Sequence, residues 1–394
     1  MPMQIQLPIA PRDVVLPDYG ADGLYGFARG LRDWLREPGA AWPQAGIGMG
    51  ARTVVVLLII DGLGDGFLAR HGSGSTLLAH RVRPMSSVFP STTASAVTLL
   101  HTGLSPAEHG LNGWFIHDRR FGGVIAPLPL LQRGNGPVDA FRLTSRLFPY
   151  DSMFRGAQRP VTVLSPADLA LSRFSRHHSR GARILPYKGL DELGPAILQA
   201  AAVLQGVGGL VHAYYPVFDA ISHAYGAHSS QALSVFARID TLFGALSVAL
   251  RDSGAVLLAT ADHGFIDAPP EKVVSIEPGS AVAQMLAAPL FGERRAAFCA
   301  LRKGAEGEFD AWAATELQGK AVALPGKAVL ESGLLGPGKP NRRLRERVGD
   351  RVLLMERGWT LVDTVEGEKP HAMIGVHGGL SADEMWVPLI RSAP

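Results

Sequence analysis

The sequence predicts an α/β protein in which a large, mostly parallel sheet lies between helices. Three segments, at residues 53–60, 209–215 and 255–260, have the length of strands and an almost unbroken apolar or β-branched composition. Such segments are typical of strands whose two faces are both covered. A helical pattern at about 191–206 precedes the second strand, and another at about 230–252 precedes the third. This alternation favours a sheet layered by helices.

The rest of the chain predicts one arm and two insertions. Residues 1–50 are rich in proline and glycine, with one helical pattern, and we expect an N-terminal arm packed on a core domain at 51–394. Residues from about 115 to 190 carry many arginines, prolines and aromatic residues, and we expect them to form an inserted cap. Residues from about 268 to 350 show short strands and turns, which predicts a small α+β subdomain.

Composition excludes several classes of protein. The chain has 394 residues, 47% of them hydrophobic, and a net charge of +3 without a concentrated basic run, so no nucleic-acid polymer is expected as a partner. The arginine-rich piece at 341–347 is interpreted as a solvated helix face. The single cysteine, Cys299, excludes an intrachain disulfide.

Targeting signals are also missing from the sequence pattern. The N-terminal residues lack the charged and apolar regions of a secretory signal, so a cytoplasmic location is expected. No uninterrupted apolar run approaches the roughly 20 residues that span a bilayer, so no membrane is expected as a partner. The oligomeric state is left open.

Each of the three predicted strands is followed by an aspartate. Asp61 comes directly after the first strand, Asp219 follows the second, and Asp262 follows the third. Taken alone, Asp61 could equally cap a helix. Two histidines accompany the later aspartates: His223 lies four residues after Asp219, which is one helical turn, and His263 is adjacent to Asp262. In open α/β sheets this edge is where ligands bind.

A fourth chain segment adds His377, which is followed by Gly378 and Gly379. Carboxylates and imidazoles converging from separate elements are typical of a site for two divalent metal ions. Because neutral imidazole is a good zinc ligand and magnesium prefers oxygen, zinc is favoured. Two ions about 3.5–4 Å apart activate an attacking oxygen and stabilise a leaving one.

A hydroxyl lies at the start of another predicted helix. The segment 85–93 leads into the apolar residues 94–100, so Thr93 falls in the first helical turn. The positive end of the helix dipole would favour an alkoxide or a bound phosphate there. The structural alternative is a serine or threonine that only caps the helix.

These motifs, taken in order, resemble the alkaline phosphatase superfamily and, within it, the type I phosphodiesterase/nucleotide pyrophosphatase family. The resemblance covers about 51–115, 191–267 and 350–394 and implies an alkaline phosphatase-like fold. The motifs that carry it are Asp61-Gly62, Phe89-Pro90-Ser91-Thr92-Thr93, the segment from Thr102 to Gly110, Asp219-x-x-x-His223, Asp262-His263-Gly264, His377-Gly378-Gly379 and Trp386-Val387-Pro388-Leu389-Ile390.

The resemblance also implies roles for the residues. One zinc would be held by Asp219, His223 and His377. The other would be held by Asp61, Asp262, His263 and the Thr93 oxygen. Thr93 would act as nucleophile and form a phospho-threonine that water then hydrolyses.

Two departures from the family pattern leave alternatives open. The family places an asparagine shortly after the His-Gly motif to bind a phosphate oxygen; by strict spacing this position is Trp114, and Asn112, two residues earlier, could substitute as the substrate-binding residue. Residues 94–97 also differ from the family pattern, and Thr92 adjoins Thr93 as an alternative nucleophile. The choice between a diester and a monoester is therefore open.

The expected function is metal-dependent hydrolysis of a phosphoric ester, with a small phosphate ester or nucleotide as substrate. Phosphodiester or nucleotide pyrophosphate cleavage is favoured. Within the same superfamily, a phosphomonoesterase, a phosphonate hydrolase or a phosphotransferase is the alternative. A zinc-binding interaction module without catalysis is the alternative from another class. Substrate specificity is expected to lie in the two insertions.

Overall fold

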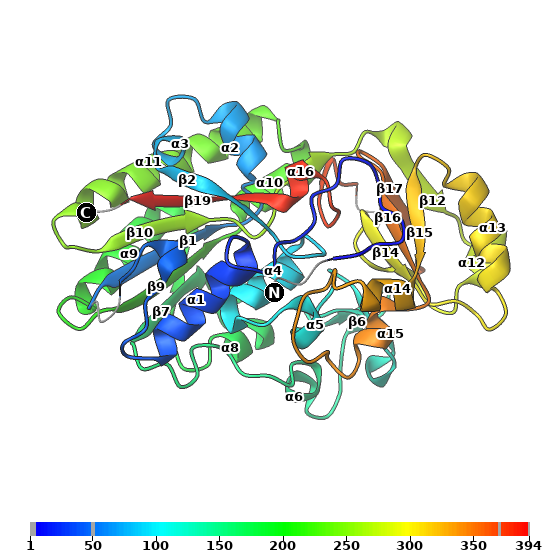
Figure 1. Ribbon diagram of the computed structural model, residues 1–394, viewed down its shortest axis with the longest axis horizontal. Helices are drawn as coiled ribbons and strands as arrows, with labels where there is room; N and C mark the ends of the chain where they lie inside the picture. Colours follow the sequence, from blue (N-terminus) through cyan, green and yellow to red (C-terminus); the bar gives the residue numbers. More distant parts are fainter. Residues whose placement is uncertain (1–4, 49–51, 369–371, 393–394) are drawn as a thin grey trace.

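The computed structural model of the protein describes residues 5–48, 52–368 and 372–392 (Figure 1). Parts of the expected N-terminal arm, residues 1–4 and 49–50, therefore lie outside the described residues. A large sheet surrounded by helices occupies one half of the molecule, and a smaller sheet with short helices occupies the other. The fold is mixed α/β with a mostly parallel central sheet, which confirms the predicted fold class.

The central sheet has seven strands. In spatial order these are β2 (Arg81–Ser86), β19 (Trp386–Ser392), β10 (Val256–Thr260), β1 (Val54–Ile60), β9 (Gly209–Tyr215), β7 (Val161–Pro166) and β8 (Arg183–Tyr187). The five strands from β10 to β8 run parallel to one another. The strand β19 is antiparallel to both of its neighbours. The three strands that the sequence marked as doubly covered are thus direct neighbours in the middle of the sheet.

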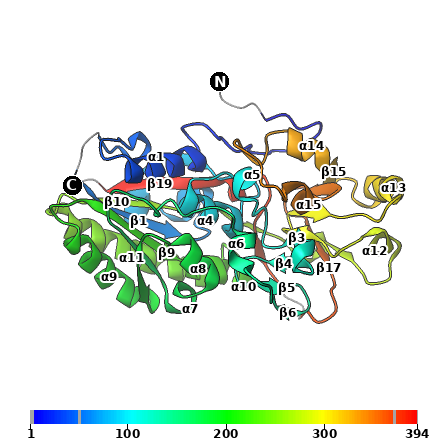
Figure 2. The same cartoon turned by 90° about the horizontal axis from the view of Figure 1, so that it is seen from below.

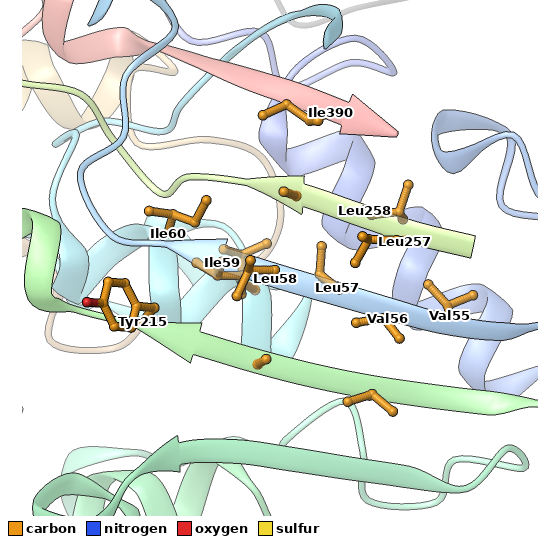
Figure 3. Packing of buried hydrophobic residues seen from close by; sticks show 14 of the residues in the cluster. Val55, Val56, Leu57, Leu58, Ile59, Ile60, Tyr215, Leu257, Leu258 and Ile390 are labelled. Carbon is orange, nitrogen blue, oxygen red and sulfur yellow. The ribbon is translucent and has the colours of Figure 1, made fainter. Parts of the chain in front are cut away.

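Strand β1 forms the centre of the hydrophobic core. All seven of its residues are buried, and it pairs with β9 on one side and β10 on the other. Figure 3 shows its side chains packed with Leu257 and Leu258 of β10, Tyr215 of β9 and Ile390 of β19. Burying a valine, leucine or isoleucine side chain contributes about 1.5–3 kcal/mol, so this strand is a major source of the stability of the sheet.

Helices cover both faces of the sheet. Figure 2 shows α9 (Gly189–Val203) and α11 (Ser230–Arg251) on one side and α1 (Leu24–Arg36) on the other. The helix α1 packs against α4 (Thr93–Thr102), and Trp42 donates its indole N–H to the Phe27 carbonyl of α1. The remaining helices of this half are α2 (Asp65–His71), α3 (Thr76–Ala79), α5 (Pro106–His109), α7 (Ala167–Ala170), α8 (Arg173–His178), α10 (Val217–Tyr225), α16 (Ala382–Met385) and the 3-10 turn η1 (Pro43–Ala45).

Within the described residues, α11 alone is long and apolar enough to have the length and composition of a membrane span. Its residues Phe236, Ile239 and Phe243 are buried in the core that also contains β1 and β10. Their spacing of three and four residues places them on one face of the helix. This packing accounts for the apolar residues on the buried face of α11.

The segment 115–190 divides into two structural parts. Its first part forms a small antiparallel sheet with one helix: β3 (Ile116–Asp118), β4 (Gly123–Ala126), β5 (Leu131–Gln132), β6 (Gly136–Pro137), α6 (Leu143–Leu147) and the 3-10 turn η2 (Arg119–Phe121). Its second part contributes β7 and β8 to the central sheet. The strand β8 lies at the sheet edge, is only partly buried and contains Arg183 and Pro186, so its sequence lacks a buried-strand pattern.

The second half of the molecule is built around a four-stranded antiparallel sheet. Its strands, in spatial order, are β13 (Phe291–Gly292), β14 (Ala296–Cys299), β16 (Arg351–Met355) and β15 (Ala321–Pro325). The accompanying elements are α12 (Ala281–Met285), α13 (Glu306–Glu316), α14 (Gly326–Glu331), α15 (Leu344–Val348), the 3-10 turn η3 (Pro270–Lys272) and the parallel pair β12 (Val273–Ile276) and β17 (Thr360–Asp363). The sheet therefore continues past residue 350.

The arginine-rich piece at 341–347 is only partly solvated. Arg342, Arg343 and Arg345 are exposed, but Arg347 is almost completely buried. Its guanidinium forms an ion pair with Asp118 at 3.0 Å and donates to the Gly110 carbonyl at 2.8 Å. The interpretation of this piece as a solvated face was wrong for Arg347, because its partners come from segments about 230 residues earlier in the chain.

Candidate active site

The predicted site residues converge at one edge of the central sheet. Asp61 follows β1, and Asp262 and His263 follow β10; because these two strands are parallel neighbours, their ends meet. Asp219 and His223 lie one turn apart on α10, directly after β9. The remaining histidine, His377, follows β18 (Gly375–Val376), which pairs with β11 (Ile266–Asp267) just beyond β10.

His263 lies at the centre of the cluster. Its Nε2 atom is 3.3 Å from Asp61 Oδ1, 3.5 Å from Asp262 Oδ2 and 3.8 Å from Asp219 Oδ1. His377 Nε2 is 3.7 Å from the same Asp219 oxygen and 3.2 Å from His223 Nε2. Two groups of three residues each place ligand atoms within 4.8 Å of one another: Asp61 with Asp262 and His263, and Asp219 with His263 and His377.

The three histidines share one orientation. The Nδ1 atoms of His223, His263 and His377 lie 2.8, 3.0 and 3.1 Å from the carbonyl oxygens of Gly375, Gly264 and Ser91 respectively. Since a carbonyl oxygen only accepts, each Nδ1 must carry the proton and donate it. In the neutral imidazole each Nε2 is then a lone-pair donor directed toward the aspartates, as in histidines that bind metal ions.

Each of the three aspartates has a buried carboxylate oxygen without a hydrogen-bond donor among the described residues. In the described part of the chain, Asp61 Oδ1, Asp219 Oδ1 and Asp262 Oδ2 are buried and accept no hydrogen bond. Burial raises the pKa of Asp61 to about 6 and that of Asp262 to about 7, and it raises the pKa of Asp219 well above its usual value. Unpaired buried carboxylates are costly. The donor set therefore fits divalent cations, which would compensate this charge.

Thr93 lies within the same cluster. It is the first residue of α4, and its Oγ1 is 3.2 Å from His263 Nε2. The N-cap residue is Thr92, whose side chain does not cap the helix but donates to Glu293 Oε1 at 2.5 Å. The structure thus brings Thr93 to the histidine and aspartate cluster and holds the Thr92 hydroxyl on another partner.

Asn112 does not reach the cluster in the structure. Its side chain is fully buried, and its Nδ2 donates to the Arg347 carbonyl at 2.6 Å. Trp114 occupies the loop nearer the site, with 41% of its surface exposed, and its backbone N–H donates to Glu293 Oε1 at 2.6 Å. The suggestion that Asn112 could bind substrate lacks structural support, because the side chain is used to hold α15.

Two residues near the site were missed by sequence reasoning. Tyr214, on β9, donates its hydroxyl to Asp61 Oδ2. Its position near the end of the predicted strand that precedes Asp219 could have indicated it as a site residue. Glu293 lies in the turn between β13 and β14, and burial raises its pKa to about 7. Nothing in its local sequence, Glu293-Arg294-Arg295, distinguishes it from a surface turn.

Comparison with known families agrees with this geometry. Residues 188–380 match the family model described as type I phosphodiesterase / nucleotide pyrophosphatase. The predicted resemblance to this family is confirmed. The matched range contains Asp219, His223, Asp262, His263 and His377. Asp61 and Thr93 lie outside the matched range, but both are close to His263, which lies inside it.

Solved structures show the same fold. Murine ectonucleotide pyrophosphatase/phosphodiesterase 5 is 18% identical over 87% of this chain and 88% of its own, with a TM-score of 0.63. An inactive variant of that murine protein in complex with AMP gives a TM-score of 0.62 at 17% identity, covering 86% and 87% of the two chains. Phosphonoacetate hydrolase from Sinorhizobium meliloti 1021 in complex with phosphonoformate gives 0.58 at 18% identity, covering 87% and 90%.

A comparison with curated protein sequences finds no match. The family match and the shared fold agree with a phosphodiesterase/nucleotide pyrophosphatase-like hydrolase, as the sequence predicted. The general activity is that of a metal-dependent phosphoric-ester hydrolase, and the two groups of carboxylates and histidines are its candidate metal-binding residues.

Proposed function

We propose that this hydrolase cleaves phosphodiesters or nucleotide pyrophosphates through Thr93, with two divalent ions, zinc by preference, held beside it. The observation that carries the proposal is the combination of three buried carboxylate oxygens without hydrogen-bond donors and three Nε2 atoms directed at them. Thr93 Oγ1 is in contact with the same group of atoms.

The proposed ligands form two sets. Asp219, His223 and His377 would hold one ion, because the two Nε2 atoms lie 3.4 and 3.7 Å from Asp219 Oδ1. The second would be held by Asp61, Asp262, His263 and Thr93. When bound, such ions supply Lewis-acid charge that lowers the pKa of a hydroxyl and stabilises a departing oxygen.

The reaction follows in two steps. The Thr93 oxygen attacks phosphorus and forms a new P–O bond, while the bond to the leaving alcohol or phosphate breaks; the leaving oxygen keeps the electron pair and takes up the proton that the Thr93 hydroxyl loses. Water then attacks the phosphorylated Thr93; its oxygen forms the new P–O bond of the released phosphomonoester, and its proton restores the Thr93 hydroxyl. The N–H groups at the start of α4 lie at the positive end of the helix dipole and would stabilise the oxygens of the phosphoryl group.

We propose small phosphate esters or nucleotides as substrates. The murine relative was solved with AMP, which supports a nucleotide ligand for this fold. The phosphonate hydrolase neighbour supports phosphonates as the alternative to test. A cytoplasmic location remains a prediction from the sequence.

The first test combines metal content with a nucleophile variant. We expect elemental analysis to give two zinc ions per chain in wild type and in Thr93→Ala. Hydrolysis of bis-p-nitrophenyl phosphate should fall at least about a thousandfold in the variant, because the attacking atom is gone. If Thr92→Ala rather than Thr93→Ala abolishes turnover, the nucleophile is Thr92. Absence of metal from carefully prepared wild type would refute the metal assignment.

A substrate comparison tests the type of ester. The diester should be turned over faster than p-nitrophenyl phosphate and faster than phosphonoacetate. A much faster monoester or phosphonate reaction would replace the diesterase proposal by that activity. No turnover of any of the three, with two metal ions bound, would indicate a binding module that has lost catalysis.

A further inference from the structure

Glu293 adds a fourth carboxylate to a site that already contains three aspartates. It reaches the site from the second half of the molecule, in the turn between β13 and β14. Its Oε1 accepts hydrogen bonds from the Thr92 hydroxyl at 2.5 Å and from the Trp114 amide at 2.6 Å. Thr92 immediately precedes the proposed nucleophile, so the carboxylate lies beside the N-terminus of α4.

The same carboxylate borders the loop that carries His377. A Cβ atom on Gly378 would lie 2.5 Å from both Cβ and Cγ of Glu293, so the glycine allows this close approach. The charge of Glu293 also interacts with Asp219 and His263, two of the proposed metal ligands. Glu293 is therefore fixed between the nucleophile segment and the histidine loop.

The two side-chain hydrogen bonds of Glu293 use only one of its carboxylate oxygens. Both donors bind Oε1, and Oε2 takes part in neither contact. Of the two arginines that follow it in the chain, Arg295 is paired with Glu384 at 2.9 Å. The charge of Arg294 lowers the pKa of Glu293 by less than burial raises it, so this arginine offsets the carboxylate only in part.

We propose that Glu293 determines substrate specificity by selecting phosphoryl groups with a single negative charge over those with two. This proposal deepens the proposed function and depends on it. A diester has one charge at phosphorus, whereas a monoester and inorganic phosphate have two near pH 8. A fixed carboxylate near the phosphoryl oxygens repels the doubly charged group more strongly.

The expected effect is about ten- to a hundredfold in relative specificity, as expected for one unit charge acting over several ångströms at a partly buried site. The proposed roles of Thr93 and of the metal ligands stay as described above. Glu293 acts on the charge of the substrate, and its contacts with Thr92 and Trp114 fix where that charge is located.

The test replaces the charge and keeps the shape. In Glu293→Gln the amide oxygen can still accept from Thr92 and Trp114. The ratio of kcat/KM for p-nitrophenyl phosphate to that for bis-p-nitrophenyl phosphate should rise at least about tenfold. Glu293→Ala, which also loses both hydrogen bonds, should shift the ratio in the same direction with a lower kcat for both esters. Thermal unfolding and elemental analysis establish that both variants are folded and retain metal.

A binding measurement provides a readout that is independent of turnover. Calorimetric titration with inorganic phosphate should give a Kd about tenfold lower for Glu293→Gln than for wild type. The matched control is Glu331→Gln, which removes one exposed negative charge from α14 in the same half of the molecule. This control should change neither the ratio nor the Kd.

The outcomes separate this inference from the proposed function. If wild type cleaves the diester and Glu293→Gln changes both the ratio and the phosphate Kd by less than twofold, Glu293 does not determine specificity. An equal shift in Glu331→Gln would assign the effect to overall charge and overturn the inference. If wild type cleaves no phosphate ester, the proposed function fails, and the phosphate titration still decides whether the Glu293 charge opposes phosphate binding.

Discussion

A single hydroxyl fixes the orientation of the carboxylate at the end of the central strand. Tyr214 donates to Asp61 Oδ2, which leaves Asp61 Oδ1 facing His263. Tyr214 is itself positioned by Tyr187, whose hydroxyl donates to the Tyr214 carbonyl at 2.6 Å. Residues that orient a metal ligand in this way affect metal affinity without contacting the ion.

At the residue scale, Tyr214→Phe should weaken metal binding about tenfold or more, because the Asp61 carboxylate loses the donor that orients it. Competition with a chelator, followed by elemental analysis of the retained zinc, measures this. The control is Tyr215→Phe, since the next residue of a strand points to the opposite face. Equal zinc retention in wild type and Tyr214→Phe would show that the hydroxyl does not position Asp61.

Individual residues also show where sequence reasoning succeeds. Asp61, Asp219 and Asp262 were identifiable because each follows an apolar strand, and the edge of a parallel sheet brings such ends together. Glu293 was not identifiable, because a turn between two short strands has no periodic pattern. The burial of Arg347 depends on Asp118, which is remote in the sequence. Such pairings exist only after the fold has formed.

At the scale of elements, the loops that follow β1 and β10 approach each other at glycines. A Cβ atom on Gly64 would lie 2.8 Å from the Cα of Gly264, and one on Gly264 would lie 2.1 Å from the Asp383 carbonyl oxygen of α16. The Gly264 amide donates to the Glu384 carbonyl at 2.8 Å. Because Gly264 follows His263 directly, this packing also positions the histidine.

Gly264→Ala should therefore reduce the free energy of unfolding by about 1–3 kcal/mol, since the added methyl group must displace backbone. Urea denaturation measures the change, and zinc content should fall as His263 is displaced. Gly307→Ala is the matched control, because a Cβ atom there meets nothing within 4 Å and the residue lies in α13. It should leave stability unchanged or raise it slightly. Equal stability of the two variants would contradict the packing argument.

The sequence predicted some strands accurately and gave no indication of others. The strands β1, β9 and β10 were predicted within about one residue of their ends, because buried strands of a parallel sheet have continuous apolar sequences. The edge strand β8 was missed, since a half-exposed strand has no such pattern. The small sheet of strands β3 to β6 was also hidden, because its strands have two to four residues each.

At the scale of the whole molecule, a group of buried histidines stabilises the fold only in the neutral state. His101 on α4, His178 on α8 and His212 on β9 are buried, and the ring centroids of His101 and His212 are 4.7 Å apart. Burial lowers the pKa of His101 to about 4 and lowers those of His178 and His212 well below the usual value. These residues link α4 to the sheet.

The sign of the pH effect follows from these pKa values. Below pH 6.5 the unfolded chain binds a proton at residue 101, whereas the folded protein does not until about pH 4. Stability is therefore lost as the pH falls through this window. In His101→Asn this loss is absent, so the difference in unfolding free energy between wild type and variant should shrink by about 2 kcal/mol from pH 7.5 to pH 5. Urea denaturation at both pH values measures it. A constant difference would mean that His101 titrates alike in both states.

The position of β19 in the central sheet has a consequence for synthesis of the chain. This strand is made after all other strands of the sheet, yet it lies between β2 and β10. Until it emerges from the ribosome, the facing edges of β2 and β10 have no partner, and exposed strand edges promote association between chains. The central sheet of the nascent protein therefore has a gap between β2 and β10 until residues 386–392 have emerged. Chaperones that shield strand edges should bind the chain up to that stage.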